Sequence, residues 1–243
     1  MAINNDDIFL TVRPKNIYFD GCSWTRGAEL ELPESERFSK LLSEHYDCRE
    51  TNLGKSGGSN NRIVRNLIVE NNIRSMYDLA IIQMSYPART EFYFDYEKQW
   101  IRINPSYNFS KAHYERPWKR GIVGRVDANS KSNFHYDCPL CGTKTKKLSE
   151  KFTREAEFWH DYYRVVTSEE FYDTKEEIHY HTIKNHCQVN NIPLIIMSIN
   201  KWTRLDFDLQ LDVQNLPRAP KAHPNKEGHR MIADELIKLI DQI

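Results

Sequence analysis

The stretch GCSWT, residues 21–25, and the stretch HPN, residues 223–225, carry most of the information in this chain. The first follows an apolar run over 16–19 that is typical of a buried strand, and the second directly precedes an amphipathic pattern. In an open parallel α/β sheet, strand ends and helix starts meet at one edge. Ser23 and His223 would then lie close enough to act as a nucleophile and its base.

The composition is that of a globular chain without charge bias. Of its 243 residues 40% are hydrophobic and 12% aromatic, and Lys+Arg and Asp+Glu are both 34. Nothing in this balance points to nucleic acid as a partner, and no apolar run approaches the roughly 18 residues of a membrane span. The first residues lack the basic and apolar regions of a signal peptide. We therefore read the five cysteines as reduced thiols of a cytoplasmic protein.

Short apolar runs alternate with helical patterns, which indicates a parallel sheet with helices on both faces. The pattern predicts one three-layer α/β/α, flavodoxin-like domain over 1–243, with His229 on the surface of the last helix. Strands are predicted at 16–19, 49–53, 79–84 and 192–198, and helices at 35–46, 60–72 and 226–243.

An aromatic-rich segment at about 91–148 interrupts this alternation after the third strand, and its second part is basic. An irregular insert of this length is usually functional or an added interaction surface. The alternative is a loop excursion that packs its aromatic side chains on the domain.

A glycine-rich loop, residues 52–61, follows the second strand and opens a helix. Glycines let backbone approach a ligand, and N–H groups at a helix start favour an anion. The alternative is an ordinary glycine turn in which Ser59 or Asn60 caps the helix.

These three segments, in this order, resemble the SGNH/GDSL hydrolase superfamily over about 16–90 and 192–243, and they look most like phage and bacterial members with a Gly-Cys-Ser-x-Thr start. The resemblance implies Ser23 as nucleophile, His223 as base, and the backbone N–H groups of Ser23 and Gly57 as oxyanion donors. Cys22 stands where the family has Asp. It is interpreted as a small buried residue beside the turn, with its thiol as the alternative nucleophile.

The first departure from the family pattern concerns an oxyanion donor. The family's third block carries an Asn after the third strand, and here Pro87 stands roughly in its place. Loss of one such donor costs about 10²–10³ in rate elsewhere, so a substitute is expected. Arg89 is the preferred one, because the phage-type relatives resemble this chain in an Arg at that place, and Asn60 and Ser85 are the alternatives.

The second departure concerns the acid that orients the histidine. The family places Asp three residues before the His, and here that residue is Pro220. Three readings are open. A backbone carbonyl could leave a Ser–His dyad, Asp206, Asp208 or Asp212 could reach in, or the enzyme could be slow or inactive.

The stretch CPLC, residues 138–141, has the spacing of half a zinc knuckle. Cys138 and Cys141 are the predicted ligands, with His135 as a further one. A second Cys pair is absent, so other partners would be needed, either from a second chain or from among His113, His179, His186 and Cys187. Such a zinc ion would hold the insert together and would take no part in the chemistry. The predicted catalysis therefore requires no cofactor. A nucleic-acid-binding knuckle is the rival reading, which the neutral charge disfavours.

Together these features predict an SGNH-type serine esterase or deacylase acting on a small-molecule or glycan ester, such as an O-acetyl sugar or a short acyl ester. The aromatic insert would border its pocket, and no membrane partner is expected. The alternative is a catalytically weak or inactive binding protein of the same fold with a zinc-stapled insert.

Overall fold

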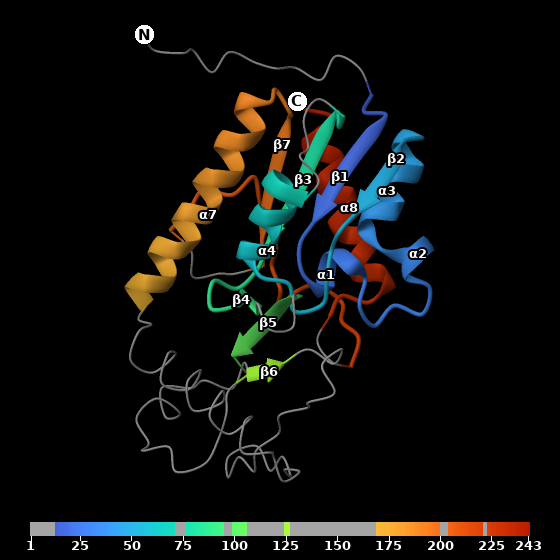
Figure 1. Cartoon of the computed structure of the whole chain (residues 1–243). Coiled ribbons are helices and arrows are strands. Elements are labelled where there is room, and N and C mark those ends of the chain that lie inside the picture. The colour runs from blue at the N-terminus through green and yellow to red at the C-terminus, as the bar shows by residue number, and fades with distance from the viewer. Residues whose placement is uncertain are drawn as a thin grey trace. The chain divides into compact units, whose positions relative to one another are not determined.

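The computed structural model describes residues 13–70, 76–94, 99–105, 124–126, 169–199, 204–220 and 223–243. The chain divides into two compact units (Figure 1). The first comprises Met1–Tyr86 with Glu176–Ile243, and the second comprises Pro87–Lys175. The predicted insert, 91–148, falls within the second unit.

The first unit is built on a five-stranded parallel sheet with the order β2-β1-β3-β7-β8. The apolar β1 and β3 lie in its interior, as expected of strands that are covered on both faces. The chain reverses its direction of travel across the sheet between these two strands, and ligands of such sheets bind at the carboxyl ends there. The strands are β1 (Asn16–Asp20), β2 (Arg49–Asn52), β3 (Leu79–Met84), β7 (Leu194–Ser198) and β8 (Leu209–Gln210).

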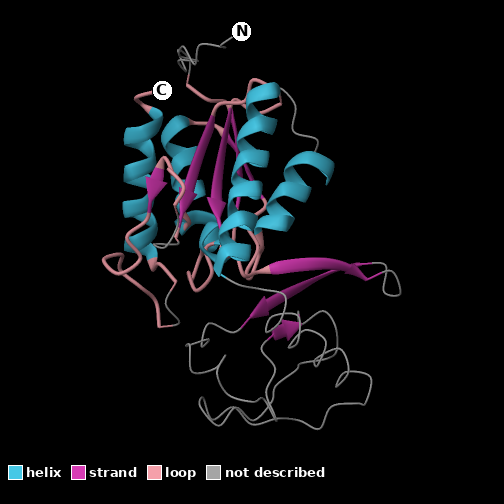
Figure 2. Ribbon diagram, turned by 90° about the vertical axis from the view of Figure 1, so that its left-hand side faces the viewer, coloured by secondary structure: helices cyan, strands magenta, loops and turns pink. Residues whose placement is uncertain are grey.

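Helices cover both faces of this sheet (Figure 2). Phe19 and Ile81 point into a core shared with α3 and α8, and Tyr18 and Ile82 point into a core shared with α4, η1 and α7. This alternation gives the three layers of the predicted α/β/α fold. The helices are α1 (Ser23–Arg26), α2 (Pro33–Glu36), α3 (Phe38–Tyr46), α4 (Asn60–Arg65), the π-helical η1 (Asn66–Glu70), α7 (Glu169–Val189) and α8 (Lys226–Ile240).

The described part of the second unit contains an antiparallel sheet with the order β4-β5-β6. The sequence predicted an irregular insert here and no sheet. The strands of this sheet are β4 (Thr90–Phe94), β5 (Gln99–Pro105) and β6 (Gly124–Val126). The first turns of α7, as far as Lys175, belong to this unit as well. There the ammonium group of Lys175 donates to the carbonyl of Arg89 at 3.4 Å.

Two predicted helices differ from the observed ones. The helix expected at 35–46 is divided, because Arg37 is extended between α2 and α3 while its guanidinium binds Glu50 and Glu34. The helix expected at 60–72 changes to π geometry at Asn66, whose side chain bonds Asp20. The long helix α7 was not predicted.

None of the helices in the described part of the chain is long and apolar enough to cross a membrane.

His229 is buried, which contradicts its predicted place on the helix surface. Its ring stacks on Phe38 with centroids 5.8 Å apart, and its Nδ1 accepts the backbone N–H of Phe38 at 3.2 Å. The imidazole thus satisfies a donor at the start of α3, where the side chain of the cap residue Arg37 makes no capping hydrogen bond. Burial lowers the pKa of His229 to about 4, with His223 adding to the shift and Glu36 opposing it.

This depressed pKa predicts a loss of stability in acid. The unfolded chain binds a proton at His229 below about pH 6.5, whereas the folded chain binds it only near pH 4, so the stability is lost as the pH falls between these values. We expect the free energy of unfolding to fall by about 3 kcal/mol more in the wild type than in His229→Gln between pH 7 and pH 4. Denaturant unfolding of both proteins at pH 7 and pH 4 measures this difference. A His229 ring that titrates near pH 6.5 in NMR would contradict the prediction.

Candidate active site

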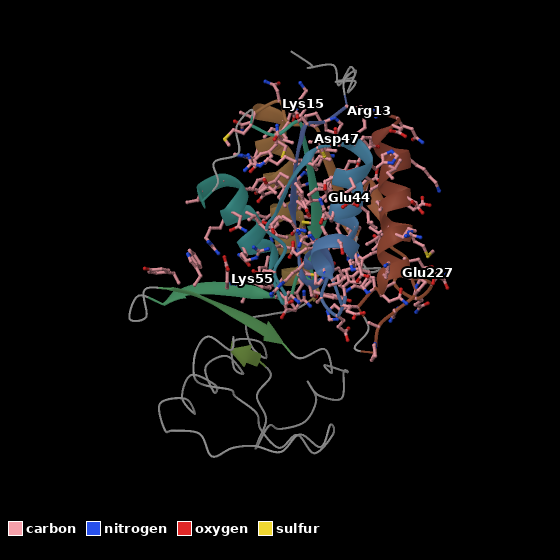
Figure 3. All side chains as sticks on the ribbon, turned by 90° about the vertical axis from the view of Figure 1, so that its right-hand side faces the viewer. Arg13, Lys15, Glu44, Asp47, Lys55 and Glu227 are labelled. Carbon is pink, nitrogen blue, oxygen red and sulfur yellow. The ribbon has the colours of Figure 1, made fainter. Side chains whose placement is uncertain are left out.

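Ser23 and His223 come together at the carboxyl end of the sheet. Ser23 is the first residue of α1, directly beyond the end of β1, and His223 lies just before α8. The Oγ atom of Ser23 is 2.9 Å from Nε2 of His223. In Figure 3 this end of the unit is marked by Lys55, which follows β2, and by Glu227, in the first turn of α8. Arg13, Lys15 and Asp47 mark the opposite end.

Backbone hydrogen bonds to residues 217 and 219 hold His223 just before α8. The carbonyl of His223 accepts the N–H of Ala219 at 2.8 Å, and the N–H of Asn225 donates to the carbonyl of Pro217 at 3.0 Å. Asn225 caps α8 by accepting the N–H of Gly228 at 3.0 Å, so the proline of the HPN stretch precedes the cap and lies outside the first helical turn. A Cβ at Gly228 would lie 2.5 Å from the Pro217 carbonyl oxygen, and this close approach requires glycine.

The carboxylate beside the histidine belongs to Glu29, a residue that the sequence patterns did not point to. Its Oε2 lies 2.6 Å from Nδ1 of His223 and also accepts the backbone N–H of His223 at 3.2 Å. The side chains of Glu29 and His223 are 16% and 24% exposed. Two carboxylates considered from the sequence make other bonds: Asp208 accepts the N–H of Ile196 at 2.6 Å, and Asp212 accepts that of Gln214 at 3.0 Å.

The turn of residues 21–25 (the nucleophile turn, after the predicted role of Ser23) is held in place by Gln83, near the end of β3. Its Oε1 accepts the N–H of Cys22 at 3.2 Å and the hydroxyl of Thr25 at 3.0 Å, and the Cys22 thiol lies 3.2 Å from the same oxygen. Cys22 is fully buried. A Cβ at Gly21 would lie 2.2 Å from Thr25 Oγ1, so only glycine fits at this turn.

Beneath this turn lies a buried ion pair between Asp20 and Arg62. Asp20 also accepts from the side chain of Asn66 at 2.8 Å, the N–H of Gly21 at 2.7 Å and the hydroxyl of Tyr18 at 3.2 Å. Burial raises the pKa of Tyr18, with the charge of Asp20 adding to the shift, so the phenol stays a donor.

Arg62 spreads this network to the neighbouring strand. Its guanidinium donates to the carbonyls of Leu53 at 2.9 Å and Gly21 at 2.8 Å. One side chain on α4 thus ties together the segments that leave β1 and β2.

The glycine-rich loop packs directly against the nucleophile turn. The N–H of Lys55 donates to the Gly21 carbonyl at 3.1 Å, and the side chain of Asn52 donates to the Thr25 carbonyl at 2.8 Å. A Cβ at Gly54 would lie 2.7 Å from the backbone nitrogen of Arg26, which is too close for any other residue.

The predicted oxyanion glycine lies in the same loop. Gly57 has a φ of 71°, a left-handed conformation that suits glycine. The loop ends at Ser59, whose hydroxyl accepts the N–H of Arg62 at 3.3 Å and caps α4. Ser59 was one of the two caps predicted for this helix. The loop therefore brings Gly57 to the edge of the sheet where Ser23 lies.

The further oxyanion candidates lie in different units. Asn60 and Ser85 bind each other reciprocally: the amide oxygen of Asn60 accepts the N–H of Ser85 at 2.7 Å, and its nitrogen donates to the Ser85 carbonyl at 3.1 Å. This pair joins the start of α4 to the end of β3, and it leaves Asn60 Nδ2 a second N–H. Arg89 belongs to the second unit, so its assistance to Ser23 stays a prediction.

The predicted zinc ligands Cys138, Cys141 and His135 lie outside the described residues. Within the part of the chain that the structure describes, no group of three or more His, Cys, Asp or Glu side chains could hold a metal ion. The zinc site stays a prediction that elemental analysis of the purified protein tests.

The hydrogen-bond network around Asp20 and Arg62 predicts that breaking this buried ion pair lowers the free energy of unfolding much more than breaking an exposed pair. Arg62→Met leaves the buried Asp20 without its ion-pair partner, so we expect the free energy of unfolding to fall by about 3–5 kcal/mol. The control is Lys40→Met, which breaks an exposed pair with Glu44 and should change it by less than about 1 kcal/mol. Urea unfolding of both variants checks this, and equal losses would contradict it.

The similarity of this chain to known proteins lies in its structure. No family model matches the chain, and no curated protein matches it significantly. A solved carbohydrate esterase, whose active site "displays divergent catalytic and non-catalytic binding functions", is similar with a TM-score of 0.51 at 11% identity, over 94% of this chain and 65% of that one.

Two further solved structures are similar over nearly the whole of both chains. The psychrotrophic esterase EstA of a Pseudoalteromonas species has a TM-score of 0.47 at 13% identity, covering 94% of this chain and 97% of that one. A lipolytic G-D-S-L family protein of Veillonella parvula has 0.38 at 11%, covering 94% and 100%. At such identities the likeness concerns the fold. The predicted three-layer α/β/α fold, a parallel sheet between two helical layers, is confirmed.

Proposed function

We propose that this protein is an SGNH-type serine esterase or deacylase that hydrolyses a carboxylic ester. The observation that carries the proposal is the 2.9 Å separation of Ser23 Oγ and His223 Nε2 at the carboxyl end of the sheet. A serine becomes nucleophilic when a neighbouring base accepts its proton, and this distance is a hydrogen bond.

In the proposed reaction, Ser23 Oγ attacks the ester carbonyl while His223 Nε2 accepts the hydroxyl proton. The N–H groups of Ser23 and Gly57 hold the oxyanion, with Asn60 or Arg89 assisting. His223 then protonates the leaving alcohol, and an acyl ester of Ser23 remains. His223 then deprotonates a water molecule, which attacks the acyl carbonyl. The bond between the acyl carbon and Ser23 Oγ breaks, the carboxylic acid leaves, and His223 returns the proton to Ser23 Oγ.

We propose a glycan ester or a short acyl ester as the substrate. The similar carbohydrate esterase offers support from the fold only. The aromatic residues of the second unit offer support from chemistry, because Tyr93 and Trp100 on its sheet are 49% and 45% exposed, with ring centroids 5.5 Å apart. Exposed tyrosine and tryptophan faces suit the apolar faces of sugar rings.

A catalytically inactive binding protein is not favoured. That alternative rested on the missing family Asn and on Pro220 in the place of the family Asp. The carboxylate of Glu29 beside His223 removes the second reason.

The proposal predicts that Ser23→Ala and His223→Ala abolish hydrolysis of short-chain aryl esters and acetylated sugars. We expect kcat to fall by at least about 10³-fold in each variant, because the nucleophile or its base is gone. Initial rates measure this, with Ser35→Ala, which alters an exposed serine on α2, as the matched control.

A fluorophosphonate probe identifies the nucleophile independently of the substrate. It should label the wild type and Cys22→Ala and fail to label Ser23→Ala. Equal hydrolysis rates in the wild type and Ser23→Ala would refute the proposed function. Labelling that persists in Ser23→Ala would implicate another nucleophile, with Cys22 the first candidate.

A further inference from the structure

We propose that Glu29 is the acid that orients His223, in place of an aspartate three residues before the histidine. The inference rests on the proposed roles of Ser23 and His223. It assigns the third member of the constellation to a residue six positions after the nucleophile, on the same turn.

The hydrogen bonds of one carboxylate oxygen carry this assignment. Oε2 of Glu29 accepts the backbone N–H of His223 at 3.2 Å and lies 2.6 Å from Nδ1, so it holds both the main chain and the ring. A carboxylate only accepts, and therefore Nδ1 carries the proton. Nε2 then has its lone pair available for the hydroxyl of Ser23, 2.9 Å away.

The charge of Glu29 suits the same role. When His223 takes the proton of Ser23, the ring becomes an imidazolium, and a carboxylate at 2.6 Å stabilises that cation through a charge-assisted hydrogen bond. The Glu29 side chain is 16% exposed, so water screens this interaction only partly.

The backbone explains how a residue so near the nucleophile can reach behind the histidine. Helix α1 ends at Gly27 in a left-handed conformation, φ 79°, and the N–H of Ala28 returns to the carbonyl of Ser23 at 2.9 Å. Glu29 itself has a φ of 70°, which is rare for a residue other than glycine. Such strained residues cluster at functional sites, and here the conformation turns the chain back toward His223.

This arrangement accounts for Pro220. With the acid supplied by the segment that follows Ser23, the turn that carries His223 needs no carboxylate of its own. Position 220 is then available for a proline.

The first experiment separates the charge of Glu29 from its size. Glu29→Gln keeps the side-chain volume and removes the carboxylate, so we expect kcat to fall by at least about 10²-fold with KM within about 3-fold and an unchanged thermal midpoint. Glu31→Gln removes an exposed carboxylate two residues further on and should retain wild-type kcat. A kcat of Glu29→Gln within about 3-fold of the wild type would overturn the inference.

The second experiment determines the tautomer of His223 without a substrate. Nitrogen-15 NMR shifts at about pH 8, where an ordinary imidazole is neutral, report which ring nitrogen of His223 carries the proton. We expect the Nδ1–H tautomer in the wild type and in Ser23→Ala, and its loss in Glu29→Ala. A wild-type ring protonated on Nε2 would overturn the inference.

The two experiments distinguish the inference from the proposed function. Equal ester hydrolysis by the wild type and Ser23→Ala would refute the function, while the tautomer of His223 would still decide whether Glu29 orients the ring. Conversely, an active enzyme that depends on Ser23 and tolerates Glu29→Gln would keep the function and remove Glu29 from it.

Discussion

The buried pair of Asp20 and Arg62 is the interaction on which the edge of the sheet depends. Charges are costly to bury, and this pair is stable because its hydrogen bonds extend to the backbone of both neighbouring segments. Arg62 holds the carbonyls of Gly21 and Leu53, so the nucleophile turn and the glycine-rich loop keep one relative position. The strand ends would otherwise present only flexible connections at the place where the site is built.

On this base the chain assembles the site from one local and one distant segment. Ser23 and Glu29 lie on a single turn whose left-handed end sets the direction of the carboxylate. His223 arrives from the other end of the chain and meets both residues. The backbone bonds to Pro217 and Ala219 and the close approach allowed by Gly228 hold it there, so the position of His223 depends on packing of α8 against the sheet.

Local features were predictable because their causes lie within a few residues. The strand runs appear within two residues of their predicted limits, and Ser59 caps α4 as one reading proposed. The prediction for His229 was wrong, because the helical pattern on α8 gives no information about the backbone N–H of Phe38, at the start of α3, that the ring accepts. Helix α7 was missed because its described stretch mixes exposed apolar side chains such as Ile178 and Val189 with buried ones, which blurs the apolar periodicity.

The sequence by itself determined the parallel α/β fold and the two motifs that place Ser23 and His223 at one edge, because strand ends and helix starts of such a fold converge there. Only the tertiary structure decided which carboxylate stands behind the histidine and which histidine is buried. Glu29 and His223 are 194 positions apart, and Phe38 and His229 are 191 apart. Contacts over such separations arise from how helices and turns pack in three dimensions, and no short-range pattern of residues encodes them.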